Sequence, residues 1–166
     1  MNGVKEGIIG IGNMGSAHLR MITGGNIPDM TVTAVCDINP ERLKAAKAEY
    51  PDIAAFGDYT ELLKSSDTDA VIIAVPHPLH AKIASEAFEY GKHVLVEKPM
   101  DITVSAAEKL CAAARKSGKV FAVMFNQRTN GLFREARRIV NSGELGELKR
   151  SVWIITNWYR TQSYYD

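Results

Sequence analysis

Cysteine is scarce in this sequence, and long apolar runs are missing. Only Cys36 and Cys111 occur among 166 residues, which is too few for a disulfide framework, and their spacing fits no metal site. We expect both to be small buried hydrophobic residues in a reducing compartment, which favours the cytoplasm. No apolar run approaches the roughly 18 residues of a membrane span, and the first expected strand lies too close to Met1 for a signal peptide. We therefore expect neither a membrane partner nor a bound metal.

The sequence also lacks an excess of charge of either sign. Its 20 basic and 19 acidic residues leave a net charge of +1, so no polyanion-binding surface is indicated and we expect no nucleic-acid partner. The 46% hydrophobic and 23% charged residues are typical of a globular domain. The length suits one core-bearing domain.

What the sequence does contain is a regular alternation of strand-like and helix-like segments. Segment 70–75 is apolar throughout, as strands buried on both faces of a sheet are. Asp58, and either Asp101 or Thr103, are expected N-caps. This order predicts an α/β fold with a doubly wound parallel sheet, the Rossmann fold. The expected strands are 3–9, 31–36, 53–55, 70–75, 93–96 and 120–125, and the expected helices are 13–23, 40–49, 59–65, 78–90, 103–116 and 131–141.

A glycine pattern, Gly10-x-Gly12-x-x-Gly15, joins the first expected strand to the first helix. Gly10 permits a tight turn, Gly12 lets phosphates approach bare backbone, and Gly15 lets the helix pack close to the strand. The N–H groups and dipole of the first helical turn then face a diphosphate. The pattern predicts a dinucleotide cofactor.

An acidic residue follows the second expected strand at the spacing of a ribose-binding carboxylate. Asp37 stands 22 residues after Gly15, near the roughly 20 residues typical of that function. A carboxylate there favours NAD over NADP, because it repels a 2′-phosphate. Arg42 could still accommodate a 2′-phosphate, so NADP stays possible. In the alternative interpretation, Asp37 merely caps the next helix.

Two further segments follow expected strands. His80 lies in the Val-Pro-His-Pro-Leu-His segment 75–80, and an ordinary helix start with an exposed His80 is the alternative. The second segment is Glu97-Lys98-Pro99. Lys98 could exchange a proton with a reacting hydroxyl, and Pro99 restricts the lysine backbone. The alternative is a surface lysine at a strand end.

The last part of the chain breaks the alternation. Segment 148–159 contains a strand-like run, and five aromatic residues crowd 153–165 without a further element to bury them. A lone strand cannot satisfy its own backbone. We expect that the natural protein continues beyond Asp166, or else that this strand pairs with a sheet of another chain.

Together these motifs resemble the Gfo/Idh/MocA oxidoreductases, named after glucose–fructose oxidoreductase, inositol dehydrogenase and a rhizopine-catabolism protein. The match runs from Val4 to about Arg128 and extends to Gly-Glu-Leu-Gly-Glu-Leu at 143–148. The ordered pair of Val-Pro-x-x-x-His and Glu-Lys-Pro is its most specific part. One departure is His77, where many relatives have asparagine.

The resemblance implies a nicotinamide-dependent dehydrogenase that acts on a sugar, cyclic polyol or related alcohol. Residues 1–128 would form the NAD(P)-binding domain. Residues 129–166 would be the connecting helix and first strand of an incomplete C-terminal domain for substrate binding and homo-oligomer formation. Lys98 would be catalytic, and the cofactor-binding residues would be Gly10, Ile11, Gly12, Asn13, Met14, Asp37, Val75, Pro76, His77, His80, Glu97, Lys98, Asn126 and Arg128.

Two other functions remain open at the level of sequence. A nucleotide-sensing or regulatory protein could keep the fold and cofactor without catalysis. A single-domain NAD-binding subunit could complete its last strand on a partner. Lys98 favours the enzyme over a sensor, because pure binding has no need of a lysine in the crevice.

Overall fold

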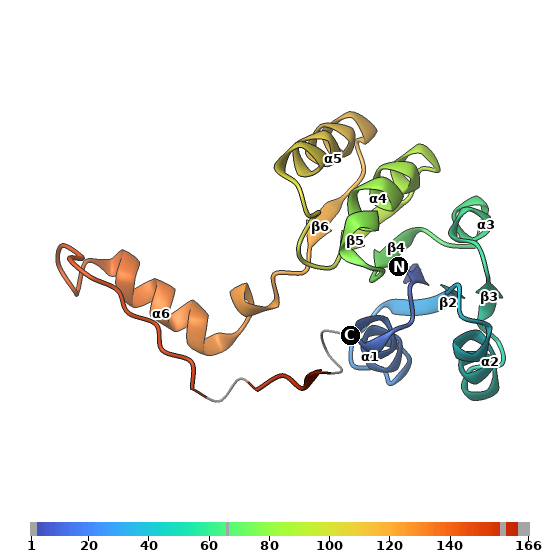
Figure 1. The fold of residues 1–166 in the computed structure, drawn as a ribbon, viewed down its shortest axis with the longest axis horizontal. Helices are drawn as coiled ribbons and strands as arrows, with labels where there is room; N and C mark the ends of the chain where they lie inside the picture. The colour runs from blue at the N-terminus through green and yellow to red at the C-terminus, as the bar shows by residue number, and fades with distance from the viewer. Residues whose placement is uncertain (1–2, 66, 157–158, 163–166) are drawn as a thin grey trace. The chain divides into compact units, whose positions relative to one another are not determined.

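A six-stranded parallel sheet of order β3-β2-β1-β4-β5-β6 forms the centre of the fold in the computed structural model, which describes residues 3–65, 67–156 and 159–162 (Figure 1). Because the strand order reverses between β1 and β4, the connections that follow these two strands lead in opposite directions and leave a crevice at the carboxyl ends, where ligands bind in such sheets. The expected fold class is confirmed. The strands are β1 (Val4–Ile9), β2 (Met30–Cys36), β3 (Ala54–Phe56), β4 (Ala70–Ile73), β5 (His93–Val96) and β6 (Phe121–Val123).

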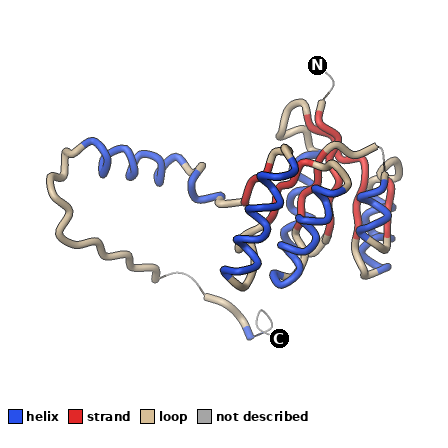
Figure 2. The backbone as a smooth tube through the Cα atoms, turned by 90° about the horizontal axis from the view of Figure 1, so that it is seen from above, coloured by secondary structure: helices blue, strands red, loops and turns tan. Residues whose placement is uncertain are grey.

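Helices cover both faces of the sheet (Figures 1 and 2). On one face lie α1 (Asn13–Thr23) and α2 (Pro40–Glu49); on the other lie α3 (Tyr59–Lys64), α4 (His80–Glu89) and α5 (Val104–Ser117). A short 3₁₀ turn, His77–Leu79, precedes α4, and another, Asn126–Arg128, precedes α6. Helix α6 spans Gly131–Ser142. Within the described parts of the chain, no helix combines the length and apolarity that a membrane span requires.

The alternation of side chains along the strands divides the core into two layers. Ile8 packs with α1 residues such as Leu19, whereas its neighbour Ile9 packs with residues of α3, α4 and α5 such as Leu110. All four residues are at most 4% exposed. Because successive strand residues point to opposite faces, a sheet buried on both sides requires continuous apolar strands, and β4 (Ala70–Ile73) is buried at every position.

Local signals position most helix starts as expected. The Asp58 carboxylate accepts the Thr60 N–H at 2.7 Å, and the Thr103 hydroxyl accepts the Ala106 N–H at 3.2 Å. The expected helix 78–90 differs, because a 3₁₀ turn precedes α4. Strand β4 is also shorter than expected: the Ala74 N–H still donates to the Ile9 carbonyl, but Pro76 has no N–H to continue the ladder.

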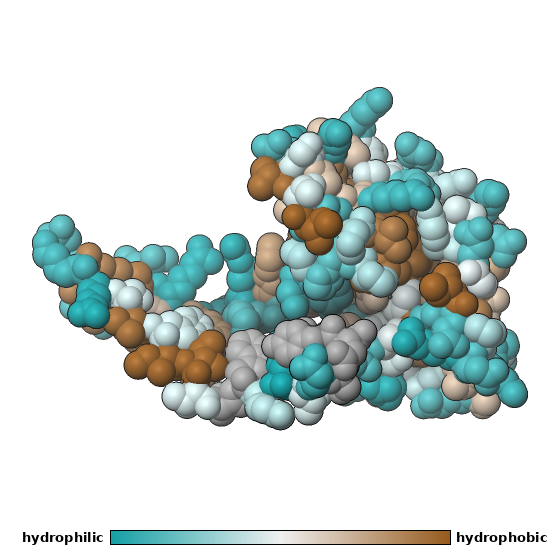
Figure 3. Space-filling model, in the orientation of Figure 1, coloured by the Kyte–Doolittle hydropathy of each residue, from teal (hydrophilic) through white to brown (hydrophobic). Residues whose placement is uncertain are grey.

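The chain divides into two compact units, Met1–Phe125 and Asn126–Asp166. The strand expected within 148–159 is wrong for the described residues 148–156 and 159, none of which is in a strand. No described strand of the second unit is present to pair with them, and Trp153 and Ile154 are 68% and 78% exposed. Figure 3 shows brown, hydrophobic residues at the surface of this unit. Residues 157 and 158 lie outside the described part. The proposed assignment of this segment to a second domain stays a prediction.

Substituting Gly15 tests the close packing of α1 on β1. A Cβ at this position would lie 1.8 Å from the Gly10 carbonyl oxygen, so helix and turn would have to separate. We expect Gly15→Ala to lower the free energy of unfolding by about 2 kcal/mol or more, measured by urea titration. Gly57→Ala is the control, because a Cβ there meets nothing within 4 Å. Equal midpoints for the two variants would contradict this packing.

We expect the stability of the folded protein to depend on pH because of Glu6 in β1. Burial, followed by the nearby charge of Asp69, raises the pKa of Glu6 from 4.5 to about 8, and its Oε1 has no hydrogen-bond partner among the described residues. The folded protein thus keeps a proton that the unfolded chain loses above about pH 4.5. The protonated Glu6 therefore contributes its full share of the free energy of unfolding below about pH 4.5, and this contribution is lost as the pH rises through about 8.

We expect Glu6→Gln, which is neutral throughout, to flatten this dependence. Urea midpoints of the wild type should fall between about pH 5 and pH 8.5 more steeply than those of the variant. The exposed Glu89→Gln supplies the control and should retain the wild-type slope. If Glu6→Gln retained that slope as well, the buried carboxyl would not be its source.

Candidate cofactor site at the carboxyl end of the sheet

The glycine turn after β1 is shaped by contacts that exclude side chains. Gly10 has a φ of +87°, and a Cβ there would lie 2.7 Å from the Ala74 carbonyl oxygen. Its N–H donates to the Cys36 carbonyl at 2.7 Å. The turn is thus seated between the ends of β2 and β4, where only glycine combines this φ with this closeness.

The first turn of α1 is left open to a ligand. Gly12 is the N-cap and supplies no side-chain acceptor, and a Cβ there would meet only Arg42, at 3.8 Å. By contrast, α2, α3, α5 and α6 begin at residues whose side chains accept a first-turn N–H: Asn39, Asp58, Thr103 and Asn130. Since the first N–H groups of any helix lack intrahelical partners, those of α1 remain available to an anion.

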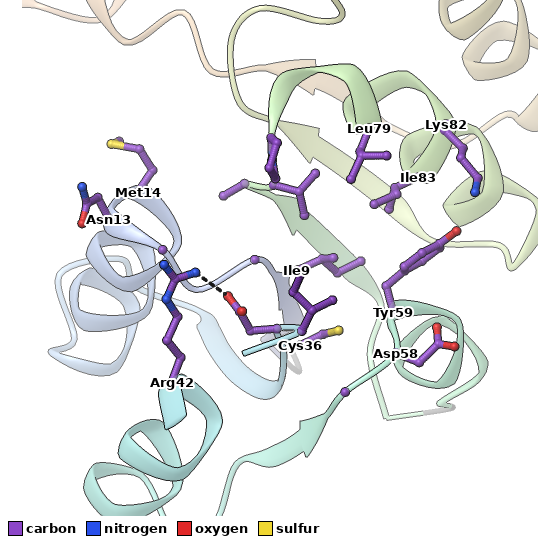
Figure 4. Close-up of a pocket in the computed structure, with 18 residues that line it drawn as sticks. Ile9, Asn13, Met14, Cys36, Arg42, Asp58, Tyr59, Leu79, Lys82 and Ile83 are labelled. Carbon is purple, nitrogen blue, oxygen red and sulfur yellow. Dashed lines mark hydrogen bonds and ion pairs between the residues drawn. The ribbon is translucent and has the colours of Figure 1, made fainter. Parts of the chain in front are cut away.

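A cavity of about 680 Å³ opens beside this turn (Figure 4). In the close-up, Leu79 and Ile83 lie across from Ile9 and Cys36, with Asn13 and Met14 at one end and Tyr59 at the other. Its size and mostly apolar walls suit a small organic ligand. The predicted site residues that line it are Gly10, Gly12, Asn13, Met14, Asp37, Val75 and Pro76.

Asp37 ties the glycine turn to the end of β2. Its buried carboxylate accepts the Ile11 N–H at 2.9 Å through Oδ2 and the Asn39 N–H at 2.8 Å through Oδ1. The alternative that Asp37 caps the next helix is wrong, because Asn39 is the N-cap of α2. The Asp37 carboxylate instead lies in the wall of the cavity.

Arg42 of α2 reaches the same carboxylate. Its Nη1 lies 3.3 Å from Asp37 Oδ2, and the arginine side chain is 53% exposed whereas that of Asp37 is 4% exposed. Arg42 and Arg20 also line a second, more polar cavity against the first turn of α1. This side of the site therefore presents a carboxylate and a movable cation together.

His80 is buried, so the interpretation of an exposed helix-start histidine is wrong. The side chain is inaccessible to solvent, with Nδ1 2.6 Å from the Pro99 carbonyl oxygen and Nε2 2.8 Å from that of Val75. A ring nitrogen that carries a proton donates it to the carbonyl oxygen that it faces. His80 thus fastens the loop after β4 to the loop after β5, and it is not among the residues lining the cavity.

The Glu97-Lys98-Pro99 segment follows β5, on the other side of β1 from Asp37. Glu97 is buried and Lys98 is exposed. The Lys98 N–H lies 3.3 Å from Glu97 Oε2, and His18 of α1 lies 2.9 Å from Glu97 Oε1 through Nε2. Neither Glu97 nor Lys98 lines the cavity, so the predicted residues occupy two separate regions of the same sheet edge.

The remaining predicted residues are placed less centrally. Ile11 lines the second cavity, and His77 is exposed with its ring 5.5 Å from that of His80. Asn126 and Arg128 form the 3₁₀ turn of the second compact unit. Their predicted contribution to the nicotinamide pocket stays a prediction.

Several residues of the site were not predicted from sequence. They share a position at the end of a strand, just after one, or on the first turns of a helix that follows one, which is a usable signal once the strand order is known. His18 is one, and the others line the larger cavity: Ile9, Cys36, Ile38, Gly57, Asp58, Tyr59, Ala74, Leu79, Lys82 and Ile83.

Cys36 cannot serve as a nucleophile at neutral pH. Burial, followed by the charges of Asp37, Asp58 and Glu61, raises the pKa of the Cys36 thiol to about 12. The protonated thiol is a poor nucleophile. Cys36 therefore contributes an apolar wall, as a small buried hydrophobic residue would.

The sequence pattern of the Gfo/Idh/MocA group, described as "Oxidoreductase family, NAD-binding Rossmann fold", matches residues 4–125. An uncharacterized oxidoreductase of Bacillus subtilis, YrbE, is 36% identical over 143 residues, which are 86% of this chain and 41% of the relative. Inositol 2-dehydrogenase of Salmonella paratyphi B is 34% identical over 87% of this chain and 43% of its own length.

Solved structures agree with these matches. The scyllo-inositol dehydrogenase of Lactobacillus casei, crystallised with NAD(H) and scyllo-inositol, superimposes with a TM-score of 0.82 at 29% identity, over 87% of this chain and 43% of that one. This chain thus spans less than half the length of the curated relatives named above. It belongs to the Gfo/Idh/MocA oxidoreductase family and contains that family's NAD-binding Rossmann domain.

Proposed function

We propose that this chain is the cofactor-binding part of an NAD(P)-dependent dehydrogenase that oxidises or forms a CH–OH group of a sugar, a cyclic polyol or a related compound. The observation that carries the proposal is the uncapped first turn of α1, set against the buried Asp37 at the mouth of a cavity of about 680 Å³. These are the groups that a diphosphate and a ribose require.

The chain's own residues fit an NAD molecule laid across the sheet edge. The N–H groups after Gly12 would bind the diphosphate, and Asp37 would accept from the adenosine ribose. The cavity between Cys36 and Leu79 would enclose the adenine. Since Glu97 and Lys98 follow β5, beyond β4 from Asp37, the nicotinamide half would extend toward them.

The chemistry would divide between the cofactor and Lys98. When bound, nicotinamide gives or takes the hydride. The exposed ammonium of Lys98 would hold or move the proton at the substrate hydroxyl, with Pro99 restricting the lysine backbone.

The substrate class rests on the relatives. Two of the proteins named above, the inositol 2-dehydrogenase and the scyllo-inositol dehydrogenase, act on inositols by name, and a cyclic polyol is therefore the first candidate. The substrate pocket and a homo-oligomer interface would lie in a C-terminal domain. Residues 129–166 would form the beginning of that domain, and its remainder would correspond to the part of those relatives that this chain does not cover. The proposed compartment is the cytoplasm.

The Asp37–Arg42 pair sets the cofactor preference. A carboxylate has about four acceptor sites, and three of those on Asp37 are used by Ile11, Asn39 and Arg42. A ribose that takes both oxygens would displace Arg42, whereas a 2′-phosphate would pair with Arg42 but face the Asp37 charge. We propose NAD as the preferred cofactor, with residual binding of NADP through Arg42.

Titration with both reduced cofactors tests this preference. We expect wild-type protein to bind NADH more tightly than NADPH. Arg42→Ala should weaken NADPH binding by about tenfold, as loss of a charge-assisted hydrogen bond does, and leave NADH binding nearly unchanged. Lys44→Ala, an exposed substitution on the same helix, serves as the control. Tighter binding of NADPH by the wild type would refute the preference.

The chain of 166 residues should bind NADH without turning over substrate. Hydride transfer requires the substrate carbon to be held against the nicotinamide. The substrate pocket is proposed to correspond mostly to the part of the relatives that this chain does not cover. We expect fluorescence titration to report NADH binding, and myo-inositol with NAD to give no rise in NADH absorbance. A sustained rise would refute this division of the site.

Lys98→Ala distinguishes an enzyme from a nucleotide sensor, in the longer protein if the natural reading frame runs past Asp166. An enzyme should keep its NADH affinity and lose at least about a hundredfold in kcat, the usual effect of removing a general acid–base. Lys116→Ala provides a control at a lysine far along α5. Unchanged turnover after Lys98→Ala would favour the sensor.

A further inference from the structure

A polar pair that is mostly shielded from solvent connects the cofactor helix to the segment that carries Lys98. His18 lies on α1, and Glu97 follows β5. Their side chains are 11% and 7% exposed, and His18 Nε2 lies 2.9 Å from Glu97 Oε1. The predicted cofactor residues account for Glu97 but give no function to His18.

The contacts of Glu97 fix the direction of its carboxylate. Because an ionised carboxylate only accepts hydrogen bonds, Nε2 of His18 must carry the proton in this pair. The other oxygen, Oε2, faces the Lys98 N–H at 3.3 Å, and the Glu97 backbone N–H donates to the Ile73 carbonyl at 2.9 Å. His18 thus holds one oxygen of a group whose other oxygen contacts the backbone of Lys98.

The position of this pair in the sheet indicates which half of a dinucleotide it faces. The turn after β1 lies between Asp37, which follows β2, and Glu97, which follows β5 beyond β4. A cofactor whose diphosphate binds the turn and whose adenosine reaches Asp37 must direct its second ribose toward β4 and β5. Two oxygens with two hydrogen-bond contacts leave the Glu97 carboxylate acceptor sites for ribose hydroxyls.

The geometry points to His18 as a positioning residue that aims the Glu97 carboxylate at the nicotinamide ribose and, through it, steadies the backbone of Lys98. This inference rests on the proposed function, since it assumes that the chain binds NAD. His18 itself touches neither cofactor nor substrate. Its place on α1, the helix whose first turn would hold the diphosphate, links the site of cofactor binding to the segment that carries Lys98.

Comparing NADH with ADP isolates this function from general stability. ADP shares the adenosine and diphosphate of NADH but lacks the nicotinamide ribose, so it cannot use Glu97. We expect His18→Ala to weaken NADH binding by about tenfold, the usual size of losing a hydrogen bond to a charged group, while ADP binding changes less than about twofold. Dissociation constants would be measured by isothermal titration on the full chain.

Two matched variants sharpen the comparison. His18→Gln keeps an N–H donor at similar reach and should restore NADH binding to within about threefold of the wild type. Met21→Ala, an exposed substitution on the same helix, should alter neither ligand. In the double variant His18→Ala/Glu97→Ala, NADH binding should be no weaker than in Glu97→Ala alone, because His18 acts only through Glu97.

Wild-type NMR spectra keep the inference testable if His18→Ala fails to fold. The His18 imidazole signal, assigned by its loss in His18→Gln, should shift on adding NADH but not on adding ADP. Parallel loss of NADH and ADP affinity in His18→Ala, no loss of either, or equal NMR shifts with both ligands would overturn the positioning function. Failure of the wild type to bind either ligand would instead overturn the proposed function itself.

Discussion

The close contact between α1 and the end of β1 is the constraint on which the site depends. With a Cβ position at Gly15 only 1.8 Å from the Gly10 carbonyl oxygen, the helix must start directly against the turn. The first N–H groups of α1 therefore lie at the carboxyl ends of the strands, where the strand order of the sheet reverses. Neither feature alone makes a site, because an uncapped helix end elsewhere would simply be hydrated. The uncapped start of α1 and the reversal of strand order occur at the same place, and together they make this edge of the sheet suitable for a diphosphate.

Buried polar side chains then join the strand-end loops to one another. Asp37 joins the end of β2 to Ile11 in the glycine turn. His80 joins the loops after β4 and β5 through Val75 and Pro99, and His18 joins α1 to Glu97. Hydrogen bonds in such shielded places are strong when satisfied and costly when broken. The apolar layers hold the sheet and helices together, whereas these bonds determine where the loops stand.

The sequence predicted what local chemistry determines, and it missed what depends on contacts between distant segments. Glycine spacing and apolar runs indicated the turn, the strands and their parallel order, and the Asp58 and Thr103 caps followed from short-range rules. The pairing of His18 with Glu97 spans 79 positions, and no local pattern encodes it. The alternative of an exposed His80 failed for the same reason. No strand forms in the described residues of segment 148–159, because a β-pattern does not form a strand without a neighbour to pair with.

In the proposed function, the site separates binding from chemistry along the sheet edge. The cavity gathers around β1, β2, β3 and the loop after β4, where apolar walls and Asp37 can hold an adenosine diphosphate tightly without touching a reacting atom. The exposed Lys98 stands after β5, where the energy of binding is useful only if it fixes the nicotinamide against a substrate. If Lys98 is the catalytic group, as proposed, its exposed side chain needs neighbouring groups that fix its orientation. The buried Glu97, held from one side by His18 and adjoining the lysine backbone on the other, is placed to impose it.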